Sequence, residues 1–159
     1  MKKLILLLFT IVSFTSFSQL IEGNWLNTEK PEMNKAIEIS QKTNKPIMLF
    51  FTGSDWCGWC KKLVKEVYKT SEFNTWAKKN VVLVEIDFPK RTKLSSELTA
   101  QNNSLKQIFQ PRGYPTVYFV KPVTGGDGNV QFKTLGQTGY VAGGPTKWIA
   151  SANQFLKDK

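Results

Sequence analysis

Two cysteines, Cys57 and Cys60, are the side chains in this sequence whose type and spacing most directly indicate a chemistry. They are separated by two residues in the run Trp56-Cys57-Gly58-Trp59-Cys60, which follows a predicted strand and begins a predicted helix. At positions i and i+3 of a helix the two sulfurs share a face, close enough to bond with little movement of the backbone. This arrangement suits a reversible dithiol–disulfide couple.

The place of the motif at a helix N-terminus gives the two thiols different roles. Cys57 would lie among unpaired N–H groups at the positive end of the helix dipole, so its thiolate should form more easily than that of a free cysteine. Cys60, one turn further along, would be shielded by packing. We therefore expect Cys57 to attack a substrate disulfide and Cys60 to resolve the mixed disulfide that results.

A structural disulfide is the alternative, since exported proteins often carry such bridges without any activity. Bridging about four residues restricts the unfolded chain by only about 2 kcal/mol, well below the effect of a bridge between distant segments. Haem attachment of the cytochrome type is excluded because Lys61 follows Cys60 where histidine is required. The position and spacing of the pair favour the redox reading.

The composition excludes several other kinds of site. The chain has 159 residues, 22 Lys and Arg against 12 Asp and Glu, two Cys and no His. Without an imidazole there is no Ser-His or Cys-His couple and no His-ligated zinc, and two cysteines alone cannot complete a structural zinc site. We therefore expect no metal and no cofactor. An apolar share of 41% suits one packed domain.

Residues 1–18 have the layout of a secretory signal peptide. Lys2 and Lys3 precede an apolar run, and small residues including Ser16 and Ser18 precede a cleavage point before Gln19. The apolar stretch of roughly 14 residues is shorter than the ~20 that span a bilayer, which argues against an uncleaved anchor. We expect a single domain over 19–159, exported to the periplasm or secreted.

The excess of basic residues persists after such a cleavage and is densest between Lys61 and Lys93. A nucleic-acid surface would be one interpretation, but an exported protein rarely meets that partner. Solvated helix faces with some attraction to anionic surfaces are the expectation, with no nucleic acid bound and a monomeric chain.

Hydrophobic periodicity and turn residues predict an α/β domain. The predicted elements, in chain order, are a helix at 31–43, a strand at 47–52, a helix from 57 that restarts at 71, a strand at 81–87, a helical pattern ending at 109, two strands at 116–120 and 131–135 joined by a Gly-rich turn, and a helix from Pro145. Strands separated by helices predict parallel pairing, and the final hairpin predicts an antiparallel edge.

Three segments resemble the thioredoxin superfamily, in particular its exported bacterial thioredoxin-like members. They are Pro46 to Lys62, Gly113-Tyr114-Pro115-Thr116, and Gly139-Tyr140-Val141 with the Gly-Gly-Pro that follows. The similarity covers roughly 37–156. It implies a thioredoxin fold with a central mixed sheet flanked by helices, an N-terminal helical extension, and an insertion at 90–103 before the helix that leads to a cis-proline.

The resemblance also implies roles for the loop at 114–116. A cis bond between Tyr114 and Pro115 would lie beside the sulfurs, and Tyr114, Pro115 and Thr116 would align an extended substrate next to the nucleophile; an ordinary turn proline is the alternative. The implied substrates are proteins with disulfides or extended chains. A membrane electron donor would keep the pair reduced.

Two departures from the family pattern concern proton transfer. Thioredoxins usually keep a buried Asp six positions before the first Cys, where this sequence has Phe51, and the Lys that often accompanies it is replaced by Leu83. Glu85, the only acid inside the strand run, is a candidate base if buried. The alternative, which we favour at this point, is a solvated charge at the strand edge.

The residues beside the cysteines suggest a direction of electron flow. Gly58-Trp59 between the sulfurs has neither the His of strong oxidants nor the Pro of cytoplasmic reductases, so we expect a reductase or a general exchange catalyst. Trp56 and Trp59 would form an apolar rim for substrate, with partial core packing as the alternative, more so for Trp56. A redox-silent binding module or chaperone-like adaptor of the same fold is the rival function.

Overall fold

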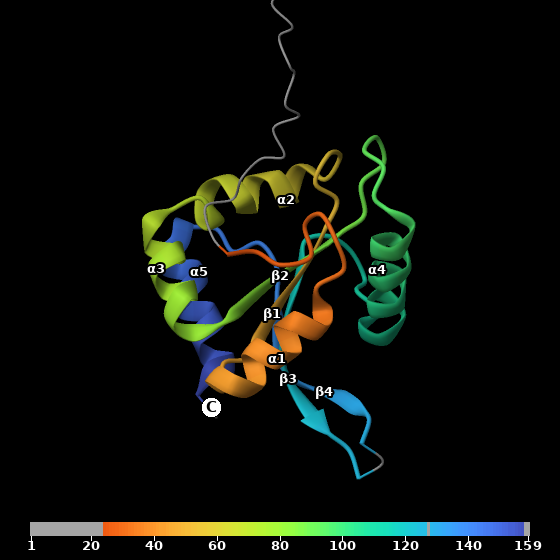
Figure 1. Cartoon of the computed structure of the whole chain (residues 1–159). Helices are drawn as coiled ribbons and strands as arrows, with labels where there is room; N and C mark the ends of the chain where they lie inside the picture. Colours follow the sequence, from red (N-terminus) through yellow and green to blue (C-terminus); the bar gives the residue numbers. More distant parts are fainter. Residues whose placement is uncertain (1–23, 127, 158–159) are drawn as a thin grey trace, which may run out of the picture.

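The computed structural model describes residues 24–126 and 128–157 and has a four-stranded mixed sheet at its centre (Figure 1). The strand order is β2-β1-β3-β4, in which β1 pairs parallel with β2 and antiparallel with β3, and β3 pairs antiparallel with β4. The strands are β1 (Ile47–Thr52), β2 (Val82–Asp87), β3 (Thr116–Thr124) and β4 (Val130–Thr138). The predicted α/β class, with one parallel pair and an antiparallel hairpin, is confirmed.

Helices cover both faces of this sheet (Figure 1). They are, in chain order, α1 (Met33–Thr43), α2 (Gly58–Leu63), the π-helical turn η1 (Val64–Tyr68), α3 (Ser71–Asn80), α4 (Ser96–Phe109), α5 (Gly144–Asn153) and the 3-10 turn η2 (Gln154–Leu156). Helices α2, α3 and α5 pack on one face, and α1 and α4 pack on the other. In the described ranges no helix has the length and apolar character needed to cross a membrane. The predicted signal peptide lies outside these ranges.

Strand β1 is buried along its whole length because both of its faces are covered. Alternate residues point to opposite sides of a strand, so Met48 and Phe50 face the α2 side, while Leu49 and Phe51 face the α4 side. A continuous apolar run is what such a central strand requires.

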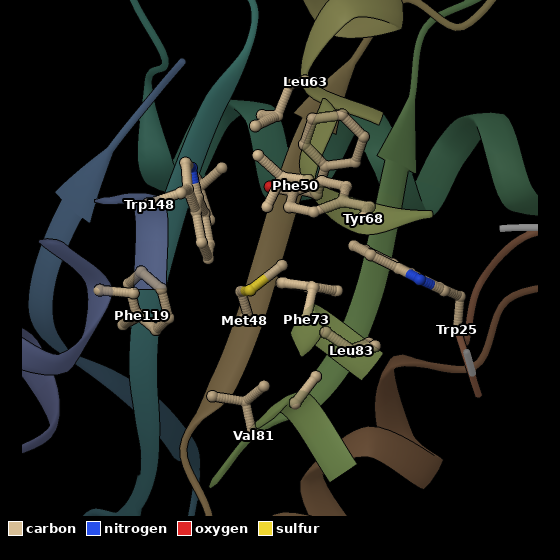
Figure 2. Close-up of a cluster of buried hydrophobic side chains, with 14 of the residues drawn as sticks. Trp25, Met48, Phe50, Leu63, Tyr68, Phe73, Val81, Leu83, Phe119 and Trp148 are labelled. Carbon is tan, nitrogen blue, oxygen red and sulfur yellow. The ribbon is translucent and has the colours of Figure 1, made fainter. Parts of the chain in front are cut away.

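The core on the α2 side is strongly aromatic. The Tyr68 ring lies edge-on to Phe50 at 5.1 Å and to Trp148 at 5.4 Å between centroids, and 5.3 Å from Trp25. Figure 2 shows Phe50 and Tyr68 between Trp148 on one side and Trp25 on the other. This cluster supports the helix that carries the cysteines, because both cysteines belong to it.

Three details differ from the sequence expectations. The hairpin strands β3 and β4 extend well beyond 116–120 and 131–135. The expected insertion at 90–103 is only partly a loop, because Ser95 caps α4 by accepting a hydrogen bond from the Leu98 N–H and residues 96–103 are helical. Ile108, assigned to a helical apolar pattern, is 61% exposed.

The segment before α1 is attached to the outer edge of β2. The Leu26 N–H donates to the Leu83 carbonyl at 2.9 Å, and the Glu85 N–H donates to the Leu26 carbonyl at 3.1 Å. The Asn27 side chain also donates to the Glu85 carbonyl and to Asn102. This segment and α1 form the expected N-terminal helical extension.

Candidate active site

Cys57 and Cys60 form a disulfide at the start of α2, with 2.11 Å between the sulfurs and 5.3 Å between the Cα atoms. Cys57 is the N-cap residue, and its Sγ accepts a hydrogen bond from the Cys60 N–H at 3.2 Å. The Lys61 N–H donates to the Cys57 carbonyl at 3.1 Å. The first sulfur therefore lies among the N–H groups of the helix start, where negative charge is favoured.

The two sulfurs differ in access. Cys57 is 6% exposed and Cys60 is 1% exposed, and both contact the apolar cluster that includes Leu63 and Val117. Cys57 is therefore the more exposed of the two, although both residues are largely buried. This asymmetry suits the division into nucleophile and resolving thiol.

The loop before β3 lies at the same end of the sheet. The peptide bond between Tyr114 and Pro115 is cis, as the resemblance implied. Thr116 pairs with Phe51 in the β1–β3 register, and its hydroxyl donates to the Gly113 carbonyl at 2.7 Å. Since β1 leads directly into the cysteine motif, this register brings the residues expected to align substrate to the end of the sheet where α2 begins.

Two aromatic pairs join the cysteine motif to neighbouring loops. Trp56 lies 5.9 Å from Tyr114 between ring centroids, and Trp59 lies 5.2 Å from Tyr140. Trp56 also donates from Nε1 to the Phe88 carbonyl at 2.8 Å. We call Trp56 with Tyr114 the first wall, and Trp59 with Tyr140 the second wall.

Both walls are accessible. Trp59 is 58% exposed and Trp56 is 37% exposed, so both rings lie at the surface and Trp56 is the more packed of the two. Gly58 lies between them at the first position of α2 and is itself exposed. Tyr140 appeared in the sequence only as part of a family-like segment, and nothing in the periodicity indicated that it would contact Trp59.

Asp55 fixes the loop that follows β2. Its carboxylate accepts the backbone N–H groups of Lys90, Arg91 and Thr92 at 2.6 to 3.2 Å. These hydrogen bonds, led by the one from Lys90, lower the pKa of Asp55 against the opposing effect of desolvation. No local sequence signal indicates this role, because Asp55 and the N–H groups that it accepts are 35 to 37 positions apart in the chain.

Asp87 holds the turn that follows β1. Its carboxylate accepts the Ser54 N–H at 2.8 Å and the Ser54 hydroxyl at 2.5 Å. Burial raises the pKa of Asp87 despite these hydrogen bonds. Asp87 therefore ties the turn before Trp56 to the neighbouring strand. This role depends on the pairing of β1 with β2, which the local sequence around Asp87 does not indicate.

Glu85 is not the solvated charge that we favoured from the sequence. It is partly buried and pairs in register with Phe50. It shares the α2 face of β2 with Leu83, because Val84 between them faces the other side. Burial, with a smaller contribution from Asp87, raises the pKa of Glu85 to about 7. A group with this pKa can accept and release a proton near neutral pH.

The position six residues before Cys57 proves to be on the wrong face for the family role. Phe51 packs against Tyr118 and Phe109 on the α4 side, away from the cysteines. The neighbouring residue Phe50 belongs, with Met48, to the cluster that contains both cysteines. The strand therefore offers no carboxylate at either position, and Glu85 on the adjacent strand is the acid nearest to Phe50 in the register.

A cavity of about 850 Å³ lies elsewhere, between α1, α3 and the edge of β2. Trp25, Asn74 and Lys78 are among its lining residues, and the lining includes neither cysteine. The candidate site is at the cysteines, because the redox-active sulfurs lie there and not in this cavity.

Comparison with known proteins agrees with this geometry. A family model described as thioredoxin-like matches residues 24–122. A curated protein of Chlamydia pneumoniae, "Disulfide bond reductase DsbH", is 33% identical over 123 residues, which are 77% of this chain and 69% of that protein. The "Thioredoxin-related protein DsbJ" of the same organism is 31% identical over 84 residues, 53% of this chain and 24% of that protein.

Solved structures give the same picture. A structure titled "DsbH Oxidoreductase" matches with a TM-score of 0.71 and 32% identity, over 82% of this chain and 85% of that one. A thioredoxin from Thermus thermophilus matches with a TM-score of 0.59 and 15% identity, over 86% of this chain and 88% of that one, which supports the fold alone.

Proposed function

Since the chain belongs to the thioredoxin-like family and is a thiol–disulfide oxidoreductase, we propose that it is exported and reduces protein disulfides through Cys57 and Cys60. The observation that carries this proposal is the asymmetric pair at the start of α2, in which Cys57 is the helix N-cap and keeps a small exposed surface, while Cys60 is fully buried one turn further along. The direction, reduction, is supported by the similarity to the disulfide bond reductase of Chlamydia pneumoniae. Export is supported by the signal-like residues 1–18.

The reaction passes two electrons from the dithiol to the substrate. The Cys57 thiolate attacks one sulfur of the substrate disulfide, and the other sulfur leaves as a thiolate that takes up a proton. The Cys60 thiol then loses its proton, and its sulfur attacks the Cys57 sulfur. This step releases the second substrate thiol and leaves the Cys57–Cys60 disulfide. A dithiol donor must reduce that disulfide again, and we propose a membrane protein for this role.

Glu85 is the proposed acceptor of the Cys60 proton. Its position opposite Phe50, on the face of the sheet that packs beneath the cysteines, supports this role. Its pKa of about 7 also matches proton transfer at neutral pH. Water could complete the path, since Glu85 is only partly buried.

Substrate would be held by the two walls and the 114–116 loop. Trp56, Gly58 and Trp59 surround Cys57, and Tyr114, Pro115 and Thr116 would align an extended chain with its disulfide toward that sulfur. The aromatic surfaces suit unfolded or extended chains, because such chains expose apolar side chains.

Reduction of insulin by dithiothreitol tests the proposal. The wild-type chain should accelerate the reaction, Cys57→Ser should abolish the acceleration, and Cys60→Ser should trap the mixed disulfide. Equal rates with wild type and Cys57→Ser would overturn the enzyme assignment and favour the redox-silent binding module. The equilibrium of the Cys57–Cys60 pair with glutathione then gives its reduction potential, which indicates the direction of electron flow. A value of about −270 mV is expected for a reductase and about −120 mV for an oxidant.

A further inference from the structure

Each aromatic wall beside Cys57 carries a lysine ammonium. Lys90 Nζ lies 4.3 Å from the ring centroid of Trp56 in the first wall. Lys62 Nζ lies 5.1 Å from the ring centroids of both Trp59 and Tyr140 in the second wall. Attraction between a cation and an aromatic face holds each charge at the rim instead of leaving it free in solvent.

The acidic side chains near the walls already have hydrogen-bond donors. Asp55 accepts the backbone N–H groups of the loop that begins with Lys90, and Glu66 accepts the Tyr140 hydroxyl at 2.5 Å. Lys62 lies 3.9 Å from Glu66, which is a long ion pair. Lys90 makes no ion pair within the ranges that the structure describes.

The other loops at this end of the sheet add positive charge and no acid. The segment 110–116 contains Arg112, and the segment 139–144 has no charged residue. Further basic residues stand beside the walls in sequence; they are Lys61, Lys65, Arg91 and Lys93. These basic residues outnumber the acids of the site, Asp55, Glu66 and Asp87. A net charge around a reactive group raises the local concentration of ligands of the opposite sign.

We propose that these two walls select disulfides whose neighbouring residues are acidic, with a carboxylate of the substrate meeting Lys90 on the first wall or Lys62 on the second. The rings would contact the apolar parts of the substrate chain, and the ammonium groups would attract its carboxylates. This inference rests on the proposed function and adds the class of substrate.

The test uses three synthetic peptides, each bridged by one disulfide and identical except for Glu, Gln or Lys at the positions on both sides of each cysteine. Turnover of each peptide is measured as kcat/KM with dithiothreitol as the reductant. We expect the Glu peptide to exceed the Gln peptide about three- to tenfold at low ionic strength, and the Lys peptide to fall below both. At about 0.5 M salt the differences should shrink to less than about twofold.

Variants assign the effect to the walls. Lys62→Gln and Lys90→Gln should each lower the Glu-to-Gln ratio by about twofold, and the double variant should bring it close to one. Lys62→Arg with Lys90→Arg should restore the ratio, because the charge returns. Lys133→Gln, which removes an exposed lysine of β4 in the distal hairpin, should leave the ratio unchanged.

Two results would overturn the inference in different ways. Equal kcat/KM for the Glu and Gln peptides, with both reduced in a Cys57-dependent manner, would refute acidic selection and leave the proposed function intact. Failure to reduce any of the three peptides would refute the proposed function itself.

Discussion

A Cβ atom at Gly53 would lie 2.4 Å from Cε2 of Trp56, so the indole lies directly against the backbone of the turn that ends β1. The Gly53 carbonyl also accepts the N–H groups of Trp56 and Cys57, at 3.2 and 2.8 Å. One residue without a side chain therefore positions both the first wall and the nucleophile.

Gly53→Ala should displace the Trp56 indole and weaken both the fold and the activity. Overpacking of this kind costs about 1–3 kcal/mol, and the loss should be visible as a lower urea midpoint and a slower reduction of insulin. Gly126→Ala is the matched control, because a Cβ there meets nothing within 4 Å. An unchanged midpoint for Gly53→Ala would contradict the contact.

Glu85 should make the folded state less stable as pH rises toward neutrality. The folded chain holds the Glu85 proton up to about pH 7, whereas the unfolded chain releases it near the ordinary pKa of 4.5. Between these pH values the folded state binds more protons than the unfolded state. The contribution of Glu85 to folding stability is therefore fully present below about pH 4.5 and is lost as pH rises through about 7.

Glu85→Gln should therefore reduce the fall in the free energy of unfolding between pH 5 and 8. It should also stabilise the oxidised chain at pH 8 by roughly 2 kcal/mol. Denaturant unfolding at pH 5 and pH 8 measures the difference. Asp55, Glu32 and Glu38 have lowered pKa values and titrate below this window. Burial also raises the pKa of Asp87, which both chains contain, so the difference between variant and wild type measures Glu85 and the slope of either chain alone does not.

The same substitution should slow resolution of the mixed disulfide. If Glu85 accepts the Cys60 proton, Glu85→Gln should lower the single-turnover release rate about tenfold at pH 7. Above about pH 9 the thiol ionises in water without help, so the rates of variant and wild type should converge. A deficit that persists unchanged at high pH would indicate a structural effect instead.

Cys57 should be alkylated before Cys60 in the reduced chain. Its sulfur lies at the helix start and is the more exposed of the two, so iodoacetamide at neutral pH should modify it about tenfold faster. Mass spectrometry of proteolytic fragments after brief exposure distinguishes the sites. Faster labelling of Cys60 would reverse the roles that we assign.

Asp55→Ala should loosen the loop that carries Lys90. The variant removes the common acceptor of three backbone N–H groups, so the amides of Lys90, Arg91 and Thr92 should exchange hydrogen markedly faster. The amides of α5, none of which is among the donors to Asp55, serve as the internal reference. Unchanged exchange at 90–92 would mean that other contacts hold the loop.

Much of the fold could be predicted from the sequence because its signals are local. The run Ile47–Thr52 coincides with β1, since a central strand covered on both faces must be apolar throughout. The Gly-rich turn between β3 and β4 and the Pro near the start of α5 were equally direct signals. The cysteine pair could also be predicted, because its spacing alone permits a disulfide.

Features that depend on pairing between distant segments could not be predicted. The environment of Glu85 is set by its register with Phe50 and by the attachment of Leu26 to the edge of β2, and neither is visible in local periodicity. Counting six positions back from Cys57 selected Phe51, but the turn at 53–56 places Phe50 on the cysteine face. The contact between Trp59 and Tyr140 likewise joins residues 81 positions apart.

The two tryptophans that flank Cys57 also make the redox state of the pair visible. Disulfides quench indole emission, and Trp56 and Trp59 are the immediate neighbours of the bridged sulfurs in the chain. The other three of the five tryptophans are Trp25, Trp76 and Trp148, which belong to or pack against the core. We therefore expect reduction and reoxidation of this protein to change its own fluorescence, which would follow the reaction in real time without a dye.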